Sequence, residues 1–448
     1  MKLLISIWLT LAVAVVAAEP ELRTWTSQSG AKVEAKLIEQ KGDDVVLEKA
    51  DGKQLAIRLD KLSEQDQEYV RSLAKPAEPA PAGGVPIEGA PPAPPAEPAA
   101  PQPEAPAYAD PDGKWKAGEI SGDIEVAKDS QWSYMLYAPK SFDPKRKWPV
   151  VFLLTQDGGG PSDAQRFVPG AELCGWIVVV TRQVRKGFFD NDTAINATVE
   201  DVLTRLPIDP KRVYLAGYLE GAYVAIQYAI EKKGTALAGL LICNGSHLEP
   251  SKVPSGTAVY GLCGSNSYRR WSMACIFREF RSSTKQWRFY IGENEWPAPE
   301  SFTDGLIWLN YTYLQTVPAS DMTLTKERKS FVKKVQTEVD HVKAESPERA
   351  YEWVTALSGT GGTDAAGRVN SPQLQALLSI PKVKRYADGQ KDLDRFVKKN
   401  FATKPDDYND KNGTKEAKDE AEKLAETYKD TYLEELFHQL GRAAIVLN

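Results

Sequence analysis

The chain has few of the residues from which metal sites and acid–base catalysts are usually built. Its 448 residues include only four cysteines and three histidines. No two cysteines form a Cys-x-x-Cys pair, so a zinc site is not indicated. Cys174, Cys243 and Cys263 lie in or beside apolar stretches, where an unpaired cysteine behaves as a small buried hydrophobe. We therefore expect no metal and no cofactor.

Two further absences narrow the range of partners. There is no basic excess, because 56 Lys and Arg stand against 61 Asp and Glu, which gives a net charge of −5. A nucleic-acid partner, which needs a basic face, is therefore not expected. The glycine run at residues 157–160 lacks both the Lys-Ser/Thr of a phosphate-binding loop and the spacing of a dinucleotide fingerprint.

Long apolar runs are missing except at the N-terminus. Met1-Lys2 is followed by an apolar stretch over residues 3–16 and by the small residues Ala17 and Ala18. This pattern is typical of a secretory signal peptide at residues 1–18, and it predicts export to a periplasm or out of the cell. An uncleaved anchor is the alternative, although the run is shorter than the ~20 residues that span a bilayer.

Composition divides the rest of the chain. Residues 74–107 are almost entirely Pro, Ala, Glu and Gly, which cannot bury enough apolar area to fold and favours an extended linker. We expect a small β-barrel at residues 21–73 before the linker, a main domain at 108–318, and a polar, helix-periodic appendage at 319–448. In that appendage, the predicted helices include residues 325–342, 347–357, 371–378, 392–401 and 414–440.

The segment at 21–73 has the pattern of a small barrel. Alternating apolar residues predict strands at 32–37, 44–49 and 54–59, with the hairpin signal Asp51-Gly52 between the last two. Ser63 and Asp66 are placed to cap a closing helix.

Trp25, Asp51-Gly52 and the ending Leu59-x-x-Leu62-Ser63-x-x-Asp66-x-x-Tyr69 resemble the SLA-one homology domain type 1. The resemblance implies an SH3-like barrel and a protein- or surface-binding module. Trp25, Leu62 and Tyr69 serve either as barrel core or as part of the binding surface.

The main domain alternates buried strands with helical stretches. Continuous apolar runs at 148–154 and 176–180 are typical of strands buried on both faces. Further strands at 133–139, 213–216, 238–243, 258–263 and 287–291 alternate with helices such as 193–206. The pattern predicts an α/β fold with a parallel sheet flanked by helices.

One turn in this domain has the form of a nucleophile elbow, the Gly-x-Ser-x-Gly turn between a buried strand and a helix. Gly217 and Gly221 stand at the required spacing, after a strand at 212–216 and before an apolar helix at 222–230. The central position, however, is Leu219. A leucine has no oxygen with which to attack a carbonyl carbon.

Together with residues 137–139, 208–214 and 292–297, the elbow resembles the α/β-hydrolase superfamily, especially exported esterases and dienelactone-hydrolase-like enzymes. The resemblance implies an acid after the seventh strand, where Ser267 stands, and a histidine after the last strand, where Asn294 stands. Neither residue can perform the role expected of it. The three empty positions predict a pseudoenzyme.

The residues around the empty site remain candidates for ligand binding. These candidates are Gly158, Gly159, Tyr218, Glu220, His247 and Trp296. Aromatic and polar groups in a crevice suit a peptide or glycan ligand. Three hypotheses stay open: a non-catalytic protein that binds a protein, peptide or glycan; a divergent hydrolase that uses Glu220 or His247; and a structural envelope protein.

Overall fold

The computed structural model describes residues 22–26, 32–41, 44–49, 54–73, 113–185, 190–231, 237–245, 247, 249–358, 372–401 and 415–443. The chain divides into two compact units, Met1–Gln102 and Pro103–Asn448. The expected signal peptide, the Asp51-Gly52 turn and the linker at 74–107 lie outside the described residues. Within the described ranges, no helix has both the length and the apolar character needed to cross a membrane.

The first unit is a small antiparallel sheet with one helix. Its elements are β1 (Leu22–Thr26), β2 (Lys32–Lys41), β3 (Asp44–Lys49), β4 (Gln54–Arg58), the 3-10 turn η1 (Leu59–Lys61) and α1 (Glu64–Leu73). The strands pair in chain order. Ser63 N donates to Thr26 O at 2.7 Å, so the segment after η1 returns to β1 and packs against this small antiparallel sheet.

Trp25 and Asp66 hold this unit together. The Trp25 side chain is 1% exposed, and its Nε1 donates to Ala35 O at 2.9 Å. Asp66 accepts from Thr26 N at 2.8 Å and pairs with Arg23 at 2.5 Å, so it joins α1 to β1 in addition to its place in the first helical turn. Tyr69 is 38% exposed, with its ring edge-on to Trp25.

The second unit is built on an eight-stranded sheet with the order β12-β11-β10-β9-β7-β8-β6-β5. The strands are β5 (Ile124–Glu125), β6 (Ser133–Tyr137), β7 (Trp148–Leu154), β8 (Ile177–Thr181), β9 (Ile208–Tyr218), β10 (Gly239–Cys243), β11 (Ala258–Gly264) and β12 (Lys285–Tyr290). The sheet is mixed rather than wholly parallel, because β6 pairs antiparallel with both β8 and β5. The predicted α/β class is therefore confirmed, with most of the neighbouring strands parallel.

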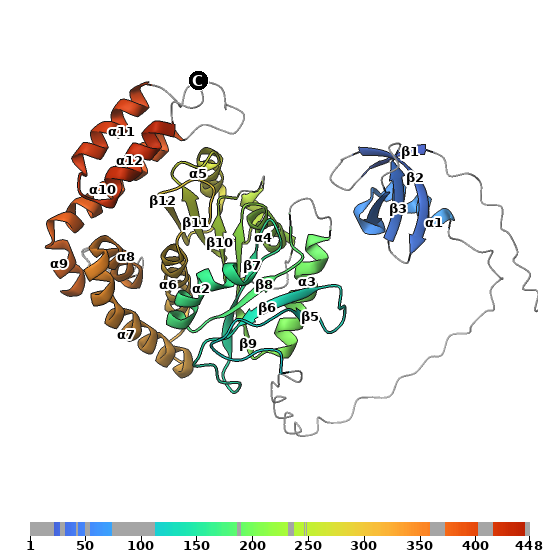
Figure 1. Cartoon of the computed structure of the whole chain (residues 1–448), viewed down its shortest axis with the longest axis horizontal. Helices are drawn as coiled ribbons and strands as arrows, with labels where there is room; N and C mark the ends of the chain where they lie inside the picture. Colours follow the sequence, from blue (N-terminus) through green and yellow to red (C-terminus); the bar gives the residue numbers. More distant parts are fainter. Residues whose placement is uncertain are drawn as a thin grey trace, which may run out of the picture. The chain divides into compact units, whose positions relative to one another are not determined.

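Helices cover both faces of the sheet (Figure 1). The helices of the hydrolase-like part are α2 (Pro161–Cys174), α3 (Asn191–Arg205), α4 (Glu220–Glu231), α5 (Arg270–Glu279) and α6 (Pro299–Thr316). One buried cluster joins α3, α4 and α5 to the sheet, and the other joins α2 and α6. The helices α2, α5 and α6 were not expected from the sequence. The three cysteines predicted to be buried are buried and unpaired.

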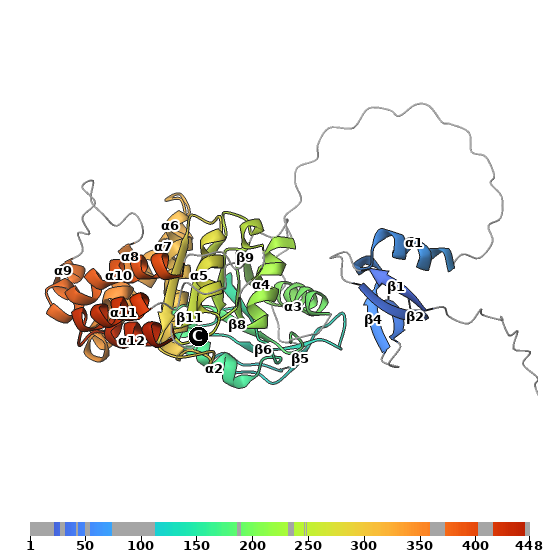
Figure 2. The same ribbon diagram turned by 90° about the horizontal axis from the view of Figure 1, so that it is seen from above.

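The C-terminal helices lie beside the β12 edge of the sheet, as both views show (Figures 1 and 2). They are α7 (Met322–Glu345), α8 (Pro347–Ser358), α9 (Pro372–Leu378), α10 (Pro381–Asn400), α11 (Lys415–Thr427) and α12 (Tyr432–Ala443). The prediction of one helix over 414–440 is wrong, because Asp430 adopts φ +63° and separates α11 from α12. The helix predicted to begin at residue 392 begins at Pro381.

Candidate functional site

The turn between β9 and α4 has the backbone of a nucleophile elbow. Leu219, at its centre, adopts φ +51°, a left-handed conformation that is costly for a bulky side chain. A Cβ atom at Gly217 would overlap the backbone of Ala222, and one at Gly221 would overlap the carbonyl oxygen of Leu154. The predicted strand–turn–helix is therefore present, and both glycines are required by close backbone packing.

The Leu219 side chain occupies the place of a nucleophile without being able to act as one. It is 9% exposed and belongs to the buried apolar cluster on the α2–α6 face of the sheet. Its backbone N–H donates to Cys243 O at 3.0 Å, which holds the turn against the end of β10. The elbow keeps its strained backbone and carries an apolar side chain at its tip.

The residues at the acid and histidine positions are in contact. Ser267 follows β11, Asn294 follows β12, and the Ser267 hydroxyl donates to Asn294 Oδ1 at 2.6 Å. The two loops approach so closely that a Cβ atom at Gly264 would overlap the carbonyl oxygen of Glu293. The link that would join a carboxylate to an imidazole is thus formed by a hydroxyl and an amide, neither of which takes up a proton near neutral pH.

Two aromatic side chains, Tyr218 and Trp296, lie beside Leu219 and Asn294, in the region that we call the mouth of the elbow. The rings of Tyr218 and Trp296 stack, with centroids 4.1 Å apart and planes 18° from parallel. The Tyr218 hydroxyl donates to the backbone oxygen of Asn294, and burial raises the pKa of Tyr218 to about 12. Tyr218 is only 7% exposed. The two candidates lie together, but they pack on each other rather than lining an open crevice.

The glycine-rich loop after β7 uses its backbone donors internally. Gly158 adopts φ +74°, and a Cβ atom there would overlap the carbonyl oxygen of Arg182. Gly159 N donates to Thr181 O at 3.1 Å, and Gly160 N donates to Asp163 Oδ2 at 2.9 Å. An oxyanion hole would need an N–H from this loop aimed at the substrate. The N–H groups of Gly159 and Gly160 are already engaged.

His247 lies against α4 with both ring nitrogens occupied. Nδ1 accepts from Glu249 N at 2.9 Å, and Nε2 lies 2.7 Å from Gln227 Oε1. This pattern fits a neutral ring that donates from Nε2. The side chain is 4% exposed. Glu220, the first residue of α4, is half-buried beside Leu219.

These contacts predict a pH dependence of stability. Burial lowers the pKa of His247 below its ordinary value of 6.5, so the unfolded chain takes up the proton first as the pH falls. The stability that neutral His247 contributes is therefore present above that value and is lost as the pH drops below it. Between about pH 7.5 and about pH 5.5, the urea midpoint of the natural chain should fall more steeply than that of His247→Gln.

The matched control for this experiment is His341→Gln, because His341 is an exposed helical residue. It should follow the natural chain across the whole pH range. Equal slopes for the natural chain and His247→Gln would contradict the role given to the buried imidazole.

Gln439 on α12 is a residue of this region that the sequence did not point to. Its Oε1 accepts from the Ser265 hydroxyl and, at 3.2 Å, from Gly292 N. The Gln439 side chain is thus bonded both to the loop after β11, which would carry the acid, and to the loop after β12, which would carry the histidine. No local pattern could have revealed it, since Ser265 and Gln439 are 174 residues apart.

Comparison with known proteins agrees with the two-part architecture. Residues 16–77 match SLA1 homology domain 1. A search of curated proteins gave no match. The segment similar to SLA1 homology domain 1 therefore lies in the first unit, ahead of the second unit with its eight-stranded sheet.

Solved structures similar to the second unit are hydrolases and esterases. FphF, a fluorophosphonate-binding serine hydrolase of Staphylococcus aureus, is 10% identical over 42% of this chain and 96% of its own, with a TM-score of 0.35. Est1E from Butyrivibrio proteoclasticus is 11% identical over 44% and 98%, with a TM-score of 0.35. An esterase from Pyrobaculum calidifontis is 12% identical over 44% and 87%, with a TM-score of 0.36.

Proposed function

We propose that the protein is an exported, non-catalytic binding protein whose α/β-hydrolase unit has lost its chemistry. The observation that carries this proposal is the side-chain content of an otherwise complete elbow. Leu219 stands at φ +51° where a nucleophile belongs, and Ser267 donates to Asn294 where a carboxylate would hold a histidine. Acyl transfer by a serine hydrolase needs all three of the missing groups.

The SLA1 homology domain supports a binding role. A module of this size carries none of the constellations needed for catalysis, and its resemblance points to recognition of a protein or a surface. The stacked pair Tyr218 and Trp296 fills the mouth above the elbow, so a protein, peptide or glycan is expected to bind elsewhere on the chain. The filled mouth also favours a second candidate function, that of a structural envelope component.

The proposal predicts no esterase activity in the purified mature chain. With 4-nitrophenyl acetate and butyrate, turnover should equal the buffer background, and a fluorophosphonate probe should leave the protein unlabelled. The Leu219→Ser/Asn294→His double variant, assayed beside it, restores two of the three missing groups on the same backbone.

The divergent-hydrolase alternative has its own control in the same assay. Turnover that persists through repurification and disappears in His247→Ala would overturn the non-catalytic proposal. Turnover that survives that variant but disappears in Glu220→Gln would overturn it as well and would assign the chemistry to Glu220.

A further inference from the structure

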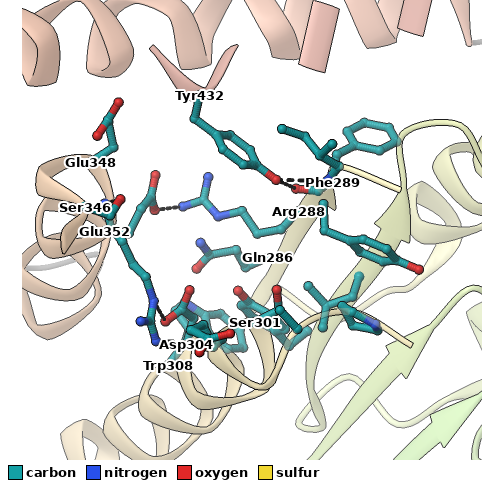
Figure 3. A pocket seen from close by; sticks show the side chains of 18 of the residues that line it. Gln286, Arg288, Phe289, Ser301, Asp304, Trp308, Ser346, Glu348, Glu352 and Tyr432 are labelled. Atoms are coloured by element: carbon teal, nitrogen blue, oxygen red, sulfur yellow. Dashed lines mark hydrogen bonds and ion pairs between the residues drawn. The ribbon is translucent and has the colours of Figure 1, made fainter. Parts of the chain in front are cut away.

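A cavity of about 390 Å³ lies where the C-terminal helices meet the edge of the sheet. It is enclosed by β12, the start of α6, the helix α8, and single residues from α10 and α12 (Figure 3). Its volume is within the range of ~300–1,000 Å³ that is typical of small-molecule sites. Trp296 and Glu295 border it, so the cavity adjoins the filled mouth of the elbow but is a separate space.

Two ion pairs lie on the walls of the cavity. Arg288 on β12 pairs with Glu352 on α8, which also accepts from the Tyr386 hydroxyl at 2.9 Å. Asp304 on α6 pairs with Arg349 at 2.8 Å. Glu295 and Glu300 also border the cavity and form no ion pair with a described residue, so the walls carry an excess of negative charge that disfavours an anionic ligand.

Three neutral polar groups on the walls have no hydrogen-bond partner among the residues that the structure describes. The Gln286 amide, the Ser301 hydroxyl and the Trp308 indole N–H border the cavity, and none of them makes a hydrogen bond to another described residue. Figure 3 shows Gln286 extending into the middle of the cavity, with Ser301 below it. A ligand that supplies hydrogen bonds to these half-buried groups would gain affinity from them.

Aromatic rings form much of the remaining wall. They belong to Tyr260, Phe289, Tyr290, Trp296, Trp308, Trp353, Tyr386 and Tyr432. Trp353 is itself held in place, because its Nε1 donates to Asp304 Oδ1 at 2.6 Å. Flat rings beside neutral donors and acceptors suit a ligand with apolar faces and a rim of hydroxyl groups.

A peptide strand added to the edge of β12 fits this site less well. Strand addition needs free backbone groups along the sheet edge. Here Ile291 N donates to the Tyr432 hydroxyl at 3.0 Å, and that hydroxyl lies 3.5 Å from Phe289 O. Tyr432 therefore occupies two backbone groups at the end of β12 that an incoming strand would need there.

We propose that this cavity binds a short neutral saccharide, with its ring face against Trp308 and its hydroxyls on Gln286 and Ser301. The inference rests on the binding role proposed above and gives that role a ligand class and a place outside the elbow. Saccharide binding in this cavity involves no chemical step. Esterase activity would therefore contradict only the proposed function, and a lack of sugar binding would contradict only this inference.

The experiment titrates the full mature chain with cellobiose, maltose, xylobiose, mannobiose and chitobiose at millimolar concentrations, and it reads tryptophan fluorescence and calorimetric heat. At least one of these sugars should give a saturable signal. Gln286→Ala and Trp308→Ala should each weaken its binding about tenfold, the expected effect of losing one hydrogen bond to the ligand or one stacking ring. Trp308→Phe keeps a flat ring and should retain part of the affinity.

Tyr268→Ala is the matched control, because Tyr268 is an aromatic residue 64% exposed that does not border the cavity. It should bind like the natural chain. The proposal is overturned if no sugar in the panel gives a saturable signal with folded protein. It is equally overturned if binding is unchanged in both Gln286→Ala and Trp308→Ala, or if only an unstructured peptide titrates the site.

Discussion

Replacing Gly221 by alanine is expected to destabilise the second unit by about 3 kcal/mol, the upper part of the range for overpacking a closely packed interior. The added Cβ would overlap the carbonyl oxygen of Leu154 and would come within 2.9 Å of Thr155 N. Both are backbone atoms at the end of β7, so no side-chain rotation can relieve the clash. Urea unfolding followed by tryptophan fluorescence reports on this unit, which holds nine of the eleven tryptophans.

The control for the elbow glycine is Gly122→Ala. A Cβ atom at Gly122 meets no atom within 4 Å, so this variant should be neutral or more stable by a few tenths of a kcal/mol, about the gain expected from a less flexible unfolded chain. Equal midpoints for Gly221→Ala and Gly122→Ala would contradict the close approach of α4 to β7.

The second large effect is expected at Arg212, a fully enclosed cation near the start of β9. Its side chain is 1% exposed. Nε donates to Asp209 Oδ2 at 2.8 Å, and Nη1 donates to Glu327 Oε1 on α7 at 2.6 Å. Arg212→Ala would leave Asp209 without its cation and Glu327 with only the exposed Arg146, 3.1 Å away, and it should cost about 3 kcal/mol, the lower part of the range for losing one partner from a buried ion pair.

Two variants make the Arg212 experiment specific. Lys211→Ala changes the neighbouring exposed cation and should shift stability by no more than about 0.5 kcal/mol. Arg212→Lys keeps the charge but loses the planar fork that reaches both carboxylates, so it should fall between the two. Equal urea midpoints for Arg212→Ala and Lys211→Ala would contradict the proposal that the Arg212–Glu327 ion pair holds α7 to the sheet.

The elbow could be predicted from the sequence because it is a local structure. A strand, a sharp turn and a helix are encoded within about fifteen consecutive residues, and the Gly217–Gly221 spacing is set by backbone contacts across that turn. The contact between Ser267 and Asn294 was not predicted from the sequence; it arises because both residues follow neighbouring parallel strands whose ends lie at the same edge of the sheet.

Other parts of the fold were missed for physical reasons. Eight of the eighteen residues of α6 are buried, so its apolar residues do not follow a single stripe and the 3.6-residue period is weak. The region at 414–440 has helical periodicity on both sides of Asp430. A single left-handed residue, Asp430, interrupts the helix there. Local periodicity carries no information about that kind of break.

The sequence by itself determined the two-part organisation, the α/β class of the second unit, the empty nucleophile position and the lack of a histidine beside it. These follow from composition, periodicity and motif spacing, which act over short stretches of chain. Only the tertiary structure decided that Tyr218 and Trp296 close the mouth, that Gln439 fastens its loops, and that a cavity opens beside β12. Those features depend on contacts between residues far apart in the chain, such as Arg288 and Glu352, which are 64 positions apart, and packing geometry rather than local pattern sets such contacts.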